Sequence, residues 1–146
     1  MFTEQLTQEV GFATEVDSQI INNTNKTTGS IDLSQFKRAF FVVNIGAVVG
    51  GGSVNLQLVE DTAANLGTAT NLAGTSASQT AITSANKLVT FEVRADQISK
   101  RYVGLKITET GSQNVQVCII GFGMDSIHKP GNSQNAASVL TQNVVS

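Results

Sequence analysis

Apolar and polar residues alternate with a period of two along several short stretches of this chain. The alternation is clear over residues 54–58 and recurs over residues 88–93 and 102–108, while residues 115–120 form a further apolar run. Residues 40–45 are apolar on both faces, as in a central strand that is covered on two sides. No stretch of twelve residues has a convincing helical period. The pattern predicts an all-β fold, with an antiparallel β-sandwich or jelly-roll-like core.

Glycine and small polar residues separate these predicted strands. Gly50-Gly51-Gly52-Ser53 reads as a loop, and Glu109-Thr110-Gly111-Ser112 reads as a hairpin turn between two strands. Residues 61–84 are rich in Ala, Thr, Gly and Ser, so we expect a long loop with marginal edge strands.

Composition divides the chain into a core and two arms. The core is predicted over residues 31–129, after an N-terminal arm of residues 1–30. Leu6, Val10 and Ala13 have helical spacing, so the arm could form a short amphipathic helix. Residues 130–146 form a C-terminal arm that contains no charged residue.

The arms are the predicted sites of contact with a partner. A free tail usually carries charge, whereas an uncharged tail with β-branched residues suits the addition of a strand to another chain. A merely disordered end is the alternative. The predicted contact residues are the larger apolar residues of both arms: Phe2, Leu6, Val10, Val139, Leu140, Val144 and Val145.

The polarity of the chain comes mainly from uncharged side chains. Ser, Thr, Asn and Gln supply 52 of the 146 residues, whereas only 14% are charged and the net charge is −2. Because nucleic-acid binding rests on clustered Lys and Arg, we expect no nucleic-acid partner. The apolar runs are too short to span a bilayer, and the first residues lack the pattern of a signal peptide. We therefore expect no membrane association and synthesis without export.

Residues that could support catalysis or metal binding are few. Cys118 lies in an apolar strand pattern without a positive neighbour, which favours a buried or half-buried structural role. His128 is the only histidine, and no nucleophile motif accompanies it. Glu60 and Asp61 sit at a strand end, where a solvated turn is the expected role. We expect a non-enzymatic protein with no catalytic residues, no metal site and no cofactor.

One block of sequence goes beyond generic strand patterning. Residues 31–46 combine a Leu-x-x-Phe-Lys/Arg lead-in with an apolar strand that ends in Gly. Residues 54–61 follow a Gly-rich loop, and residues 99–108 precede a short turn and a closing strand that contains Gly121. This order resembles small β-sandwich structural proteins of tailed bacteriophage heads, including capsid decoration (cement) proteins.

The resemblance implies a protein that is made in the host cytoplasm and added to the surface of an assembled capsid. Its implied partners are the major capsid protein and further copies of itself, with a trimer favoured. The family has no catalytic residues to carry over. A head–tail connector or tail protein is one alternative. A carbohydrate-binding β-sandwich module is another, although such modules usually stack sugars on exposed aromatic rings and this chain has no Trp.

Overall fold

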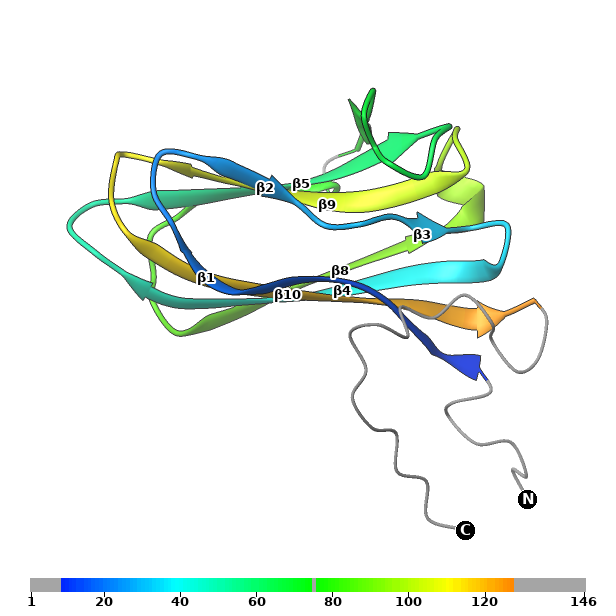
Figure 1. The fold of residues 1–146 in the computed structure, drawn as a ribbon, viewed down its shortest axis with the longest axis horizontal. Coiled ribbons are helices and arrows are strands. Elements are labelled where there is room, and N and C mark those ends of the chain that lie inside the picture. Colours follow the sequence, from blue (N-terminus) through cyan, green and yellow to red (C-terminus); the bar gives the residue numbers. More distant parts are fainter. Residues whose placement is uncertain (1–8, 75, 128–146) are drawn as a thin grey trace, which may run out of the picture.

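The computed structural model describes residues 9–74 and 76–127 as two antiparallel sheets packed face to face (Figure 1). Sheet A has the strand order β1-β10-β4-β8, and sheet B has β9 and β5 at its centre. The strands of sheet A are β1 (Gly11–Ile21), β4 (Phe36–Val48), β8 (Lys87–Arg94) and β10 (Val115–Ser126). Those of sheet B are β2 (Asn25–Thr27), β3 (Ile31–Asp32), β5 (Ser53–Asp61), β6 (Thr70–Asn71), β7 (Ser78–Ile82) and β9 (Tyr102–Thr110). The predicted β-sandwich is confirmed.

The core lies between the sheets and is built from every second residue of the long strands. Phe41, Val43 and Ile45 of β4 are fully buried, and so are Leu105 and Ile107 of β9. Successive side chains of a strand point to opposite faces, so a period of two places one row of each strand in the shared layer. Each large apolar side chain buried in this way stabilises the folded state by about 1.5–3 kcal/mol.

The N-terminal prediction needs a correction, because the sandwich begins at Gly11 and not at residue 31. β1 pairs with β10 from Gly11 to Ile21, and its Val16 and Ile21 are part of the core. Ala13 therefore lies in a strand and not in a helix. Pairing with the apolar strand β10 decides the conformation of a segment whose own helical pattern is short and interrupted by glycine. Residues 1–8 and 128–146, which include the start of the predicted N-terminal arm and all of the predicted C-terminal arm, lie outside the described residues.

The predicted hairpin at residues 109–112 is also wrong. β9 belongs to sheet B and β10 to sheet A, so the turn carries the chain from one layer to the other. Gly111 and Ser112 have φ angles of 116° and 56°, which let the chain turn sharply there. Residues 49–52 make the matching crossing from β4 to β5. Alternating patterns look the same in both cases, because periodicity does not report which strands pair.

Residues 61–84 form a long connection with two short edge strands, as predicted. β6 and β7 both pair with β5. The first part of this connection covers the outer face of sheet B: a Cβ atom added at Gly104 would collide with the side chain of Leu66. Val59, which also points away from the core, is buried. Sheet B is therefore covered on its outer side near these residues by its own loop.

Gly123 of β10 provides a test of how closely side chains pack on the core side of sheet A. A Cβ atom at this position would overlap the ring of Phe36, which is fully buried. We expect Gly123→Ala to lower the free energy of unfolding by about 1–3 kcal/mol through overpacking. Chemical denaturation measures this loss, and adding Phe36→Leu should restore part of it. A Gly123→Ala protein as stable as the wild type would contradict the described packing.

Candidate partner-binding surface

The outer face of sheet A carries apolar side chains in adjacent rows. Phe12, Phe122 and Phe40 are neighbours across β1, β10 and β4, and Ile120 lies beside Val42 in the next row. Met124 is the next outward-facing residue of β10 after Phe122, and it lies opposite Arg38 of β4. All six side chains are half-buried, and no described strand or helix covers them. We call this set the outer apolar patch; its members are Phe12, Phe40, Val42, Ile120, Phe122 and Met124.

The patch exists because β4 and β10 are apolar on both faces. On β4, Phe41 and Val43 point into the core, while Phe40 and Val42 point away from it. The sequence pattern predicted burial on both sides of this strand. The inner side is buried as expected, but the outer side is closed by no second layer within the described residues. An apolar face in this situation is typical of a surface that binds another molecule.

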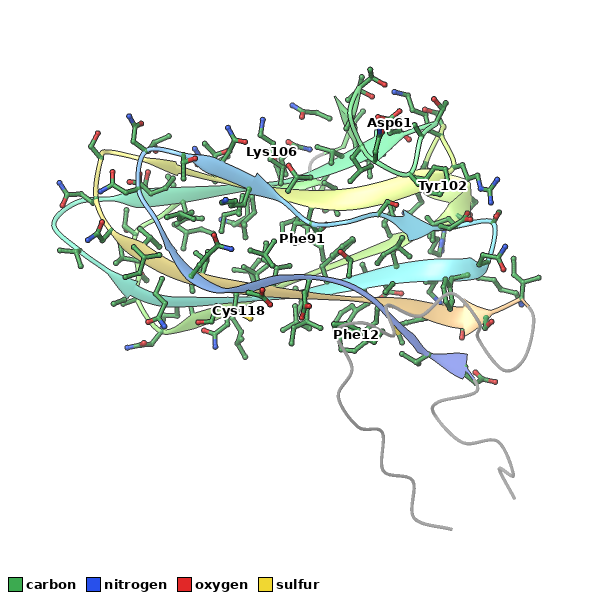
Figure 2. All side chains as sticks on the ribbon, viewed as in Figure 1. Phe12, Asp61, Phe91, Tyr102, Lys106 and Cys118 are labelled. Carbon is green, nitrogen blue, oxygen red and sulfur yellow. The ribbon has the colours of Figure 1, made fainter. Side chains whose placement is uncertain are left out.

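Two phenyl rings of the patch pack against each other. The ring centroids of Phe12 and Phe122 are 6.1 Å apart with an interplanar angle of 77°, an edge-to-face arrangement. An edge-to-face pair stabilises the structure by more than the burial of the two rings alone. Figure 2 shows Phe12 and Cys118 on the outer side of sheet A, whereas Phe91 lies between the two sheets.

Charged and polar groups border the patch at both ends. At one end Arg38 pairs with Asp125 at 2.6 Å and with Glu92 at 3.1 Å. Hydrogen bonding to Glu92, and then to Asp125, raises the pKa of Arg38. At the other end lies a shallow polar hollow of about 250 Å³, lined by Asn44, Gln116 and neighbouring residues. An apolar centre with a polar rim is the usual anatomy of a protein–protein interface.

Cys118 lies on this face as a half-buried residue of β10, which confirms its predicted structural position. Burial raises the pKa of its thiol, and the nearby carboxylates of Glu15 and Asp17 raise it further. The thiol therefore stays protonated at neutral pH. A protonated thiol is a poor nucleophile, so this environment does not activate the sulfur.

The predicted solvated turn at Glu60 and Asp61 is wrong, because both side chains are buried. Glu60 accepts hydrogen bonds from the Ser99 hydroxyl at 2.6 Å and from the Ser99 and Lys100 backbone N–H groups. Asp61 accepts bonds from the backbone N–H groups of Thr62, Ala63 and Thr68 and from the Thr68 hydroxyl. Both carboxylates are anchors for loops. Their sequence signal was ambiguous, since an acidic pair at a strand end also fits a solvated turn.

These anchors have shifted pKa values. Burial alone would raise the pKa of Glu60, but the hydrogen bonds from Ser99 and Lys100 outweigh it and hold the pKa below its usual value. The same balance between burial and donated hydrogen bonds lowers the pKa of Asp61. Hydrogen bonds that favour the ionised carboxylate make folding depend on pH.

The predicted contact residues fall mostly outside the described residues. Val10 is described and is half-buried, immediately before β1. The other six lie in the undescribed terminal segments: Phe2, Leu6, Val139, Leu140, Val144 and Val145. His128 lies there as well. The outer apolar patch was missed as a site, although the two-sided apolar pattern of residues 40–45 and 117–120 was its signal.

The part of the chain that the structure describes contains no group of three or more His, Cys, Asp or Glu residues placed to hold a metal ion. Within the same residues, no helix is long and apolar enough to cross a bilayer.

Comparisons with known proteins give weak likenesses. No protein-family model matches the chain, and a search of curated proteins found no match. Among solved structures, a Bacillus endospore appendage from a family of disulfide-linked pili aligns at a TM-score of 0.43 and 12% identity, over 85% of this chain and 97% of that chain. A structure of infectious bursal disease virus, Gt strain, aligns at 0.48 and 10%, over 82% of this chain and 37% of that one.

The CBM22-1–GH10 modules of Clostridium thermocellum xylanase 10B, complexed with xylohexaose, align at a TM-score of 0.40 and 8% identity. The alignment covers 84% of this chain and 29% of that chain. Likenesses at this level carry no conclusion about the function of this chain.

The two carboxylate anchors predict a loss of stability in acid. Because the pKa of Glu60 and of Asp61 is lowered by folding, their stabilisation is complete above the unfolded pKa, near 4, and is lost as the pH falls through the folded pKa. We expect the melting temperature to fall between pH 5 and about pH 2, and to fall less steeply for Glu60→Gln.

The matched control is Asp96→Asn, which removes a carboxylate from an exposed ion pair with Arg94. It should leave the pH dependence nearly unchanged, because exposed pairs contribute little. A Glu60→Gln protein whose melting temperature follows the same pH curve as the wild type would show that Glu60 is not an anchor.

Proposed function

We propose that this protein is a non-enzymatic structural component of a virion. In its specific form, the proposal is a capsid decoration protein that binds the assembled head of a tailed bacteriophage. The observation that carries the proposal is the outer apolar patch, which leaves one face of a rigid sandwich ready to bind another surface. The proposed partner is the major capsid protein.

The energetics of the patch support docking onto a preformed surface. Its side chains project from strands whose opposite face is locked in the core, so little conformational entropy is lost when a partner covers them. Each square ångström of apolar area removed from water contributes roughly 25 cal/mol. A rigid apolar face with a polar rim therefore binds by shape, which suits a repeated and flat shell surface better than a small soluble ligand.

The distribution of titratable groups agrees with a structural role. Glu60 and Asp61 are committed to holding loops, and the Cys118 thiol has a raised pKa. The larger hollow beside Lys37, Arg94 and Asp96 is open and bordered by ion-paired side chains. These groups stabilise the scaffold that presents the patch.

The two alternative functions make different use of the same face. A connector or tail protein would bind neighbouring copies in a closed ring. A carbohydrate-binding module would stack sugars on the row of Phe12, Phe122 and Phe40, but Phe offers no hydrogen-bonding group to orient a sugar hydroxyl. Shell binding needs only apolar contact, so it fits the row better.

Co-sedimentation with purified, undecorated phage heads tests the proposal. Val42→Glu places a charge in the centre of the patch, and we expect it to weaken binding at least tenfold, because docking would bury an unpaired carboxylate. Thr108→Glu is the matched control: it adds the same charge to the outer face of sheet B and should bind like the wild type.

The wild-type protein should pellet with the heads at a fixed ratio to the shell subunit. Binding of Val42→Glu that equals the wild type would remove the patch from the docking surface. A wild-type protein that stays in the supernatant with every head preparation, or that forms closed rings, would contradict the decoration role.

A further inference from the structure

Sheet A has one straight, open edge. Its edge strands are β1 and β8, and the pairing of β1 with β10 contains two register shifts, after Phe12 and after Val16. β8 pairs with β4 through eight consecutive residues without a shift, and no described strand pairs with its other side. Bulges protect an edge from further pairing, whereas a straight edge is a template for another strand. β8 is therefore the edge at which sheet A can be extended.

The backbone of β8 presents a regular set of free groups along this edge. Asn86 donates its backbone N–H to the Gly46 carbonyl oxygen, directly opposite on β4. Alternate residues of a strand point their backbone groups to the same side, so the residues between them point outward. The N–H and C=O groups of Val89, Phe91 and Val93 accordingly face the open edge.

The side chains of β8 divide by face in the same regular way. Val89, Phe91 and Val93 point toward the core. The outer face carries Leu88, Thr90, Glu92 and Arg94, and Leu88 is 68% exposed.

We propose that β8 pairs with β8 of a second copy, antiparallel and about a two-fold axis that passes through Phe91. The two copies of sheet A then form one continuous eight-stranded sheet. On the outer face, Leu88 lies opposite the partner's Arg94 and Thr90 lies opposite the partner's Glu92. On the core side, Val89 lies opposite the partner's Val93. Each outward-pointing backbone group of these core-side residues gains a hydrogen-bonding partner.

Charge and polarity along β8 favour this register over the two adjacent ones. Moving the axis to Glu92 would place two Glu92 carboxylates directly opposite each other, which is destabilising. Moving it to Thr90 would place Leu88 opposite the partner's Glu92, and Lys87 opposite the partner's Val93 on the core side. With the axis at Phe91, every like-charged pair is avoided and the core-side pairs remain apolar.

This pairing also determines where the two outer apolar patches lie. A two-fold axis perpendicular to the sheet keeps both outer faces on the same side. A dimer would therefore present two patches to one surface, and bivalent contact strengthens binding without new interactions. The dimer itself does not depend on the proposed function, because it forms and is measured without a shell.

Sedimentation equilibrium of the full chain, wild type and two variants at position 88, tests the inference. Leu88→Lys places a positive charge opposite the partner's Arg94 twice per dimer, and we expect the dissociation constant to rise at least tenfold. Leu88→Glu places the opposite charge there and should keep or tighten the dimer. Because Leu88 is exposed in the single chain, both variants should retain the wild-type melting temperature of the monomer.

Three results would overturn the inference. The wild type could be monomeric at all concentrations, it could form trimers or closed rings, or the two substitutions at position 88 could change the dissociation constant equally.

Deletion of residues 130–146 provides a further control. A dimer that persists after this deletion supports the β8 contact, whereas a dimer lost with the segment assigns the contact to the C-terminal arm. A stable dimer that does not bind phage heads would contradict the proposed function and leave the β8 contact intact.

Discussion

The apolar layer between the two sheets is the interaction on which the other features of the molecule depend. β4 and β10 contribute one face of this layer, and β5 and β9 contribute the other. Because β4 and β10 are also apolar on their second face, burying one face in the core places the other on the outer side of sheet A. The patch on sheet A thus results from the same strands that build the core. Its side chains are attached to a backbone that the close-packed core holds rigid.

The two outer faces of the sandwich differ in whether a described loop covers them. The outer face of sheet B is covered by the connection that follows β5, with Leu66 packed over Gly104. Asp61 holds the start of that connection through bonds to Thr62 and Thr68. The outer face of sheet A has no equivalent loop within the described residues (Figure 1). The described residues cover one outer face and leave the other without a covering layer.

Sequence periodicity predicted the fold class and most of the strands, because a strand alternates with a period of two whichever strands it pairs with. It could not reveal that residues 109–112 connect two sheets, since pairing between distant strands leaves no local signal. It also misjudged residues 11–21, where pairing with β10 decides the conformation. The acidic pair at residues 60 and 61 was read as a solvated turn, because nothing in the local sequence shows that Ser99 returns to donate to Glu60. The patch was visible as two-sided apolar strands, but burial by another layer was an equally good explanation.

In the proposed function, the outer face of sheet A is the face that docks. Cys118 is the single cysteine of the chain and lies on this face, so its alkylation rate reports coverage without any substitution. The measurement compares the rate for the free protein with the rate for protein bound to phage heads, at a pH of about 8.5 where some thiolate is present. We expect strong protection of Cys118 in the bound state. An equal alkylation rate for free and bound protein would contradict it.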